Sequence, residues 1–326
     1  MTKTATIAAA LAGIGLTLAL ASTSVAVAPD LRPIVLNASS GRINLGEEKQ
    51  LCHRLRIPRR RETEVNRIEM LVKGGSHHVH LYRPYSGPPD WPTHDCPYAV
   101  DFNKWQLVSA TQNEALDWKL HPGVGILFAP REPVLIQTHF VNAGALTTKG
   151  AARAKITLHP ADPATIRMHG GALFAQDRAL VVPPGTSTVA NRCQLTGAVS
   201  ENRTLTIMAF TGHYHFRGVR FEVQRVQVDG SLGEMLYQHD GYEDPTFEQY
   251  PVNPALVIHP GEGFEWRFTY QNDSDTTYWF GPNTQMNEHC NLFGFYYPTE
   301  VPQEAIDCVH KRDDAGNELN LRIVAH

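Results

Sequence analysis

The sequence lacks the motifs that mark several large enzyme classes. It contains no H-E-x-x-H motif, no G-x-S-x-G elbow, no P-loop and no dinucleotide-binding fingerprint. Its formal net charge is only −4, with Lys and Arg dispersed, so nucleic acid and anionic membrane surfaces are not expected partners. Helical periodicity is scarce and no low-complexity tract is present. The remaining signals are short apolar runs and histidines.

Long apolar runs are absent after the N-terminus. A single Lys and an apolar run precede Ala26-Val27-Ala28, and this pattern predicts a signal peptide over residues 1–28. Pro29 disfavours cleavage directly before it, so cleavage after Ala21 or Ala26 is an alternative. We therefore expect a secreted or periplasmic protein with no stable membrane insertion after signal removal.

Cysteine is sparse and odd in number. An exported chain meets an oxidising compartment, where thiols pair. Five cysteines allow at most two bridges within the chain and leave one thiol, and spacing alone does not assign them. They are Cys52, Cys96, Cys193, Cys290 and Cys308.

Strand-like runs recur along the chain and are separated by Pro, Gly and Asp. Asp229-Gly230 between two such runs predicts a hairpin turn. Many short strands at this spacing predict an all-β fold built from sandwiches. The segment 159–163 is the best candidate boundary, which gives an N-terminal domain over 29–162 and a C-terminal domain over 163–326. The clearest runs are 154–158, 204–210, 219–223 and 264–270.

Each predicted domain holds one set of histidines. In the second set, His213 and His215 share one face of a strand because side chains alternate, and His289 offers a third donor before an aromatic-rich strand. Three imidazoles with an open position suit Cu or Zn. The alternative is an exposed strand face and a hydrogen-bonded histidine.

The first set leaves the ligand pair open. His78 and His80 stand at i and i+2, whereas the adjacent His77 and His78 share a face only at a strand end or a bulge. Gly74-Gly75 allows the second arrangement, the pair His78 and His80 is the simpler one, and spacing alone does not choose between them. His139, on a later strand, would complete either set.

The order of these motifs resembles the copper type II, ascorbate-dependent monooxygenases. The motifs are His77-His78, Gln137-x-His139, His213-x-His215 and Glu288-x-Cys290-Asn291-Leu292. This resemblance implies two jelly-roll-like β-sandwich domains that face each other across a cleft. It also implies two copper ions per chain, with ascorbate or another reductant as electron donor.

The resemblance assigns the histidines to two roles. It implies that copper on His77, His78 and His139 stores and transfers electrons. It implies that copper on the second set binds O2 and faces a small-molecule substrate, which makes His213, His215 and His289 the catalytic ligands. His80 is then left beside the first copper. The resemblance further implies the bridges Cys52–Cys96 and Cys193–Cys308.

Departures from the family affect the second set. His289 stands where the family has a methionine, and a shifted register that brings Met286 to the metal is an alternative. Thr211 replaces a substrate-binding arginine, and Phe293 replaces a tyrosine. Asn291 keeps one polar contact available for a substrate. Gln137 either hydrogen-bonds in the cleft or only satisfies its own strand.

The sequence therefore predicts an exported dicopper monooxygenase that hydroxylates a C–H bond of a small organic substrate with O2 and an external reductant. The alternative is a non-catalytic copper-binding or copper-handling protein on the same scaffold. A zinc hydrolase is a third interpretation, with Glu288 as its general base.

Overall fold

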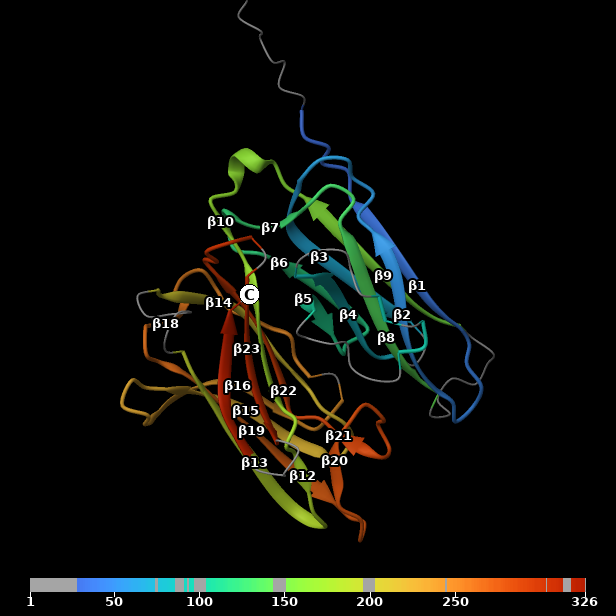
Figure 1. The fold of residues 1–326 in the computed structure, drawn as a ribbon, viewed down its shortest axis with the longest axis vertical. Coiled ribbons are helices and arrows are strands. Elements are labelled where there is room, and N and C mark those ends of the chain that lie inside the picture. The colour runs from blue at the N-terminus through green and yellow to red at the C-terminus, as the bar shows by residue number, and fades with distance from the viewer. Residues whose placement is uncertain are drawn as a thin grey trace, which may run out of the picture. The chain divides into compact units, whose positions relative to one another are not determined.

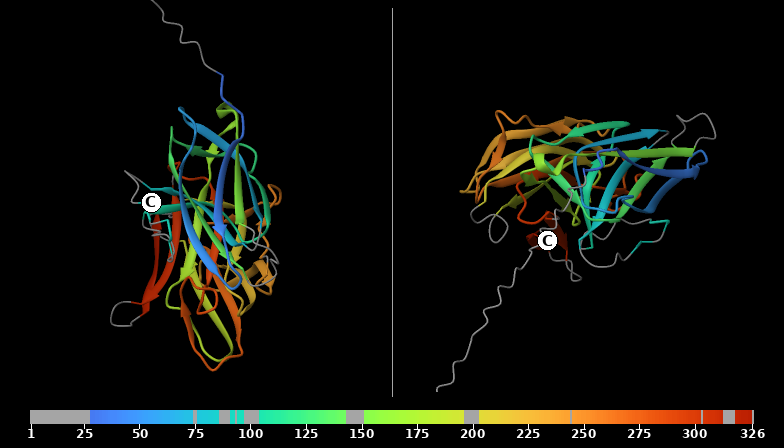
Figure 2. Two further views of the ribbon diagram at one scale, coloured as in Figure 1. Left: turned by 90° about the vertical axis from the view of Figure 1, so that its right-hand side faces the viewer. Right: turned by 90° about the horizontal axis from the view of Figure 1, so that it is seen from above.

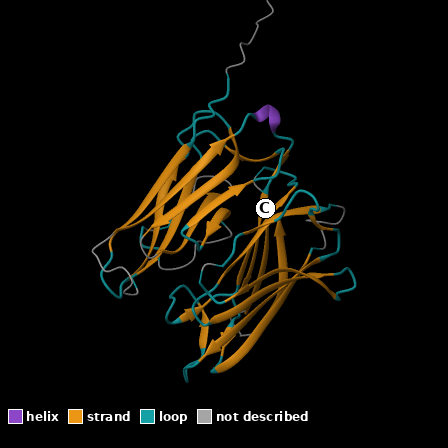
Figure 3. Ribbon diagram, turned by 180° about the vertical axis from the view of Figure 1, so that it is seen from behind, coloured by secondary structure: helices purple, strands orange, loops and turns teal. Residues whose placement is uncertain are grey.

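The computed structural model describes most of the chain after the predicted signal peptide, of which only Ala28 is included. The described residues are 28–73, 76–85, 91–92, 94–96, 104–142, 151–195, 203–243, 245–302, 304–312 and 318–325. Strands dominate this part of the chain, and its one helical element is the single 3-10 turn η1 (Pro163–Thr165) (Figure 3). The all-β prediction is confirmed. No helix among these residues has the length and apolar character to cross a membrane.

The first pair of sheets is built almost entirely from residues before η1. One sheet has the order β1-β9-β3-β7-β10, with β6 also paired to β3, and the other has the order β2-β8-β4-β5. The strands are β1 (Ile34–Arg42), β2 (Glu48–Arg56), β3 (Thr63–Lys73), β4 (Ser76–Pro84), β5 (Trp105–Thr111), β6 (Ala115–Lys119), β7 (Val124–Phe128), β8 (Pro133–Val141), β9 (Ala151–Pro160) and β10 (Met168–His169).

The second pair of sheets follows in the chain. One sheet has the order β17-β14-β22-β11-β23-β24, with β18 also paired to β14, and the other has the order β13-β19-β15-β16. A small third sheet, β12-β20-β21, accompanies them. The strands are β11 (Gly171–Asp177), β12 (Val181–Val182), β13 (Gly185–Gln194), β14 (Leu205–His213), β15 (Gly218–Val226), β16 (Leu232–Asp240), β17 (Glu248–Gln249), β18 (Leu256–Ile258), β19 (Gly263–Asn272), β20 (Tyr278–Phe280), β21 (Asn287–Glu288), β22 (Asn291–Tyr297), β23 (Ala305–Arg312) and β24 (Glu318–Ala325).

The strands predicted from sequence lie where they were expected. The runs 154–158, 204–210, 219–223 and 264–270 fall on β9, β14, β15 and β19. The predicted hairpin turn joins β15 to β16, where Gly230 has φ +82° and the Asp229 carboxylate accepts from Ser231 N at 2.9 Å. Glycine suits this position because side chains rarely adopt positive φ.

Alternating burial gives each pair of sheets its own apolar core. β1 shows the pattern plainly, with buried and exposed residues alternating from Ile34 to Ala38. One core cluster fills the first pair of sheets, and a second cluster fills the space between the β14 and β19 sheets. Phe293 and Phe295 of β22 belong to the first cluster, so the two pairs of sheets share apolar contacts.

Residues 31–326 form one compact unit. Figures 1 and 2 show the blue and green strands of the first pair beside the yellow to red strands of the second. The predicted boundary between 162 and 163 lies at the start of η1. A division into two independently folding domains, 29–162 and 163–326, stays a prediction.

Two disulfides close loops within these sheets. Cys52 pairs with Cys96 and Cys193 pairs with Cys308, the pairing that the resemblance implies. Cys290 is a buried free thiol. Burial, together with the nearby Asp177 carboxylate, raises the pKa of Cys290 well above its ordinary value. A protonated buried thiol is a poor metal ligand.

Candidate metal centre

A local irregularity in β4 brings two adjacent histidines to one face. Ser76 pairs with Phe140 of β8, whereas His78 pairs with His139, so the register slips by one residue at His77. The slip turns His77 toward the same side as His78. The ring centroids of His77, His78 and His139 lie 5.0–5.4 Å apart, and their ligand atoms lie within 4.8 Å of one another.

A carboxylate fixes the orientation of the third histidine in this first triad. Glu48 Oε1 of β2 lies 2.5 Å from His139 Nε2, which leaves Nδ1 as the nitrogen for a metal. Burial opposes ionisation of Glu48, but its contacts with His139 and Thr284 outweigh burial and lower its pKa. A carboxylate behind a ligating histidine sets the tautomer and increases ligand basicity.

The second triad comes from three neighbouring segments. His213 ends β14, His215 follows on the same side, and His289 lies between β21 and β22. The His289 ring lies 4.9 Å from that of His213 and 4.5 Å from that of His215. Met286 is 66% exposed, so the structure presents His289, not Met286, to the other two histidines.

Neutral partners orient the second triad. His213 Nδ1 lies 2.8 Å from Gln112 Oε1, and His215 Nδ1 lies 2.9 Å from the carbonyl oxygen of Asn287. These acceptors take the Nδ1 protons and leave Nε2 of both rings for a metal. Both Nε2 atoms are buried and have no hydrogen-bond partner among the described residues.

Burial keeps the cluster in the neutral form that binds metal. Desolvation, followed by repulsion from neighbouring imidazoles, lowers the pKa of His77, His78, His213 and His289 well below the ordinary value. Burial lowers the pKa of His215 to about 3. Neutral imidazole is the ligand form of histidine.

The donor set fits copper. Four buried ring nitrogens find no hydrogen-bond partner among the described residues: His77 Nε2, His213 Nε2, His215 Nε2 and His289 Nδ1. Such nitrogens are costly unless they bind a proton donor, water or metal. Two sets of three imidazoles suit copper or zinc, and copper is the metal that the sequence resemblance implies.

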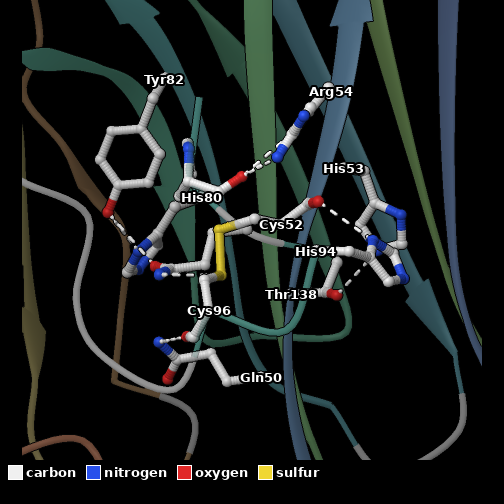
Figure 4. Close-up of a disulfide and its surroundings, with 11 residues drawn as sticks. Gln50, Cys52, His53, Arg54, His80, Tyr82, His94, Cys96 and Thr138 are labelled. Carbon is white, nitrogen blue, oxygen red and sulfur yellow. Dashed lines mark hydrogen bonds between the residues drawn. A yellow bond between two sulfur atoms is a disulfide. The ribbon is translucent and has the colours of Figure 1, made fainter. Parts of the chain in front are cut away.

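His80 supports the first triad from behind. It stacks on His78 with ring centroids 4.2 Å apart, and its Nδ1 lies 2.9 Å from the Tyr82 hydroxyl. Figure 4 shows His80 and Tyr82 on one side of the Cys52–Cys96 disulfide, with His53 and His94 on the other. Burial lowers the pKa of His80 to about 3, so this ring is a neutral packing partner.

A small cavity of about 20 Å³ adjoins both triads. A space of this size holds about one water-sized molecule. Asn291 faces it with a buried Oδ1 that has no hydrogen-bond partner among the described residues. Thr211 is buried but is not part of the lining. The lining residues are Gln50, His78, His80, Tyr82, Gln137, Gln176, His213, Pro282, His289, Asn291 and Phe293.

Glu288 has a structural role next to this site. Its carboxylate accepts from the backbone N–H groups of His215 and Arg217 at 3.1 and 3.2 Å and pairs with the Arg217 guanidinium at 3.2 Å. Burial outweighs these contacts and raises its pKa to about 7. These contacts hold the carboxylate away from the cavity, whose lining does not include Glu288, so the structure adds no support for Glu288 as the general base of a zinc hydrolase.

Sequence reasoning missed two residues that orient the ligands. Glu48 and Gln112 lie far from the histidine motifs along the chain, and neither belongs to a recognisable pattern. Only the pairing of β2 with β8 places Glu48 beside His139, and only tertiary packing places Gln112 beside His213.

A comparison with protein families finds a match in the second half of the chain. Residues 171–316 match the family described as copper type II ascorbate-dependent monooxygenase, C-terminal domain. The match includes His213, His215 and His289, and it confirms the resemblance over this part of the chain. No curated protein matches the chain.

Similarity to solved structures is weak. A cryo-EM structure of broad bean stain virus has a TM-score of 0.30 at 9% identity, covering 87% of this chain and 94% of that one. The PBCV-1 VP54 structure fitted into the virophage Sputnik has a TM-score of 0.24 at 8% identity, covering 84% and 96%. These likenesses carry no argument about function.

Proposed function

We propose that this chain, whose residues 171–316 match the C-terminal domain of copper type II ascorbate-dependent monooxygenases, is an exported dicopper monooxygenase. It hydroxylates a C–H bond of a small organic substrate with O2 and an external reductant such as ascorbate. The observation that carries the proposal is the convergence of six histidines beside one cavity, in which His77, His78, His139, His213 and His215 form two overlapping donor groups and the His289 ring contacts those of His213 and His215.

The orientation of the rings supports these ligand roles. His77, His78 and His139 would hold one copper, with His139 oriented by Glu48. His213, His215 and His289 would hold the other. Copper supplies one-electron redox chemistry and the binding of O2 at such sites. Five of these six histidines are buried and His77 is half-buried, which limits the access of bulk water.

The cavity beside His213 and His289 limits what can approach the second triad. Its polar contacts come from Asn291 and Gln137, while Phe293 gives an apolar wall. No Lys or Arg lines it among the described residues, so a substrate carboxylate finds no cation there. We therefore infer that the substrate is not a peptide held by a free carboxylate.

A coupled assay tests this function. Copper-loaded protein is given ascorbate, 18O-labelled O2 and a panel of small benzylic and aliphatic compounds, and products are analysed by mass spectrometry. We expect one labelled oxygen per product molecule and one O2 consumed per product. His215→Ala should abolish product formation, whereas His239→Ala, on β16 outside both triads, should not.

The same assay separates the rival function. A copper-handling protein would bind copper but would not couple O2 consumption to a hydroxylated product with any compound or reductant. Such a result, with copper bound at both triads, would overturn the enzyme proposal.

A further inference from the structure

The solvent-facing side of β3 carries paired charges at one end. Arg67 Nε lies 2.7 Å from the Asp117 carboxylate of β6. The Glu69 carboxylate lies 2.7 Å from the Arg67 guanidinium and 2.6 Å from His159 Nε2 of β9. Residues at i and i+2 of a strand share a face, so Lys73 at the other end of β3 lies on this same side. Each charge at the first end therefore has a partner of opposite sign or a hydrogen-bonded imidazole.

Three cations at the other end have no such partner. Lys73 of β3 pairs directly with Arg153 of β9, and Lys155 follows Arg153 on the same face. None of the three side chains forms an ion pair among the residues that the structure describes. Like charges directly opposite each other on two strands destabilise a sheet. This arrangement favours an anion that binds between the side chains and offsets their repulsion.

The same three cations line a pocket of about 670 Å³, here called the cationic pocket. Pockets that bind small molecules have volumes of about 300–1,000 Å³. Asn37, Ser39, His53 and His94 supply further polar groups to the lining, and no Asp or Glu of the described residues belongs to it. Such a lining attracts a small anion and offers hydrogen bonds to its hydroxyl groups.

The wall of the cationic pocket reaches the strand that carries His139 of the first triad. His53 lies in this wall, and its Nε2 lies 3.2 Å from the Thr138 hydroxyl. Figure 4 shows His53 and His94 beside Thr138. Thr138 and His139 are adjacent, so their side chains point to opposite faces of β8. One strand therefore separates this wall of the pocket from a ligand of the first triad.

We propose that the cationic pocket binds the external reductant of the proposed function, as a small organic anion of the ascorbate type. The identity of the anion rests on the proposed function and on the family that residues 171–316 match, which is ascorbate-dependent. Ascorbate is a monoanion at neutral pH and carries several hydroxyl groups, so it matches the charge and the polar lining of the pocket. A separate pocket leaves the cavity beside His213 and His289 to the other reactants.

Titration calorimetry tests this site on the full chain without metal, because no lining residue of the pocket belongs to either triad. Ascorbate is added anaerobically at low ionic strength in the presence of a chelator. We expect saturable binding that weakens as salt is added. Gulonolactone, an uncharged lactone of similar shape, should not bind. Absence of ascorbate binding, or equally tight binding of sulfate, would overturn the proposal.

Substitution of the cations should weaken binding while the chain stays folded, which circular dichroism checks. Arg153→Gln and Lys155→Gln should each weaken ascorbate binding by about tenfold, because each removes a charged hydrogen-bond donor. Asn37→Asp places a carboxylate directly opposite Lys155 and should weaken binding by neutralising that cation. Lys119→Gln removes an exposed cation of β6 outside the pocket and should leave binding unchanged. Binding that responds equally to Lys119→Gln and to the pocket variants would contradict the site.

Reduction of the copper-loaded protein gives a second readout. The loss of the Cu(II) signal is followed anaerobically after mixing with ascorbate. The ascorbate concentration that gives the half-maximal rate should rise by about tenfold in Arg153→Gln and Lys155→Gln, in line with the loss of binding. The rate with hydroquinone, an uncharged reductant, should not change. Equal losses with both reductants would overturn the assignment of the pocket to the anion.

Failure of this site and failure of the proposed function are distinguishable. Ascorbate binding at the cationic pocket without hydroxylation of any compound leaves the site standing and removes the enzyme function. Hydroxylation driven by ascorbate with unchanged binding and reduction kinetics in the pocket variants does the reverse.

Discussion

Each triad consists of three histidines, but the two triads differ in the residues that hydrogen-bond to those histidines. The first has a charged partner, since Glu48 contacts His139 at 2.5 Å. The second has neutral partners, Gln112 and the Asn287 carbonyl, and its carboxylate neighbour Glu288 is occupied by backbone N–H groups and Arg217. A carboxylate makes imidazole a stronger donor. We therefore expect the first copper to be bound more tightly as Cu(II).

Removal of one ligand from each triad should give the largest effect. His139→Ala and His215→Ala should each weaken the binding of one copper by about 100- to 1000-fold, or roughly 3–4 kcal/mol, which is about a quarter of the free energy of metal binding at a typical four-ligand structural zinc site. Metal analysis after dialysis should then find one copper per chain instead of two. Retention of both coppers by either variant would show that its histidine is not a ligand.

Substitution of the residues that orient the ligands should change the copper affinity of the two triads to different extents. Glu48→Gln should lower the affinity of the first copper by about 10- to 100-fold, because the carboxylate behind His139 is lost. Gln112→Leu removes only a neutral acceptor, so its effect on the second copper should be smaller. Titration against a competing chelator measures both. An equal or larger effect of Gln112→Leu would contradict the comparison between triads.

His289→Met should change only the second copper. A thioether favours Cu(I) more than imidazole does, so the reduction potential of that copper should rise. A tenfold change in the Cu(I)/Cu(II) preference corresponds to about 59 mV for one electron. Potentiometric titration followed by the Cu(II) spectrum measures the shift. A shift in the first copper, oriented by Glu48, would argue against His289 as a ligand of the second triad.

The smallest expected effect is a pH dependence of folding stability that comes from His53, a residue near the first triad. His53 contacts Thr138, next to His139, at 3.2 Å, and burial with the nearby His94 lowers the pKa of His53 to about 4. Because this pKa is lower in the folded chain, His53 contributes stability above pH 6.5 that is lost as the pH falls toward 4. Because the His53 side chain is partly exposed, its contribution to the free energy of unfolding is limited to about 1 kcal/mol.

A denaturation series measures this pH effect. Urea unfolding is compared between pH 7.5 and pH 4 for the parent protein and His53→Gln. The parent should lose more free energy of unfolding over this range than the variant. An equal loss would mean that His53 does not titrate as the contacts indicate.

Much of the fold was predictable because it follows from local patterns. The strands and the Asp229-Gly230 turn depend on alternation and on turn chemistry, which short stretches of sequence contain. The ligand pair of the first triad was less predictable. His77 and His78 share a face only because the register of β4 slips against β8, and the sequence signal for that slip was the preceding Gly74-Gly75, which lies outside the described residues.

The sequence by itself determined the all-β class, the six candidate ligands and the replacement of methionine by His289. These depend on residue type and on the two-residue period of a strand. Tertiary structure decided what each ligand touches: Glu48 behind His139, Gln112 behind His213, and His77 and His78 against His213. Contacts between residues 91 to 136 positions apart carry no signature in a single chain. Many sequences satisfy the same local rules, and packing alone sets which faces meet.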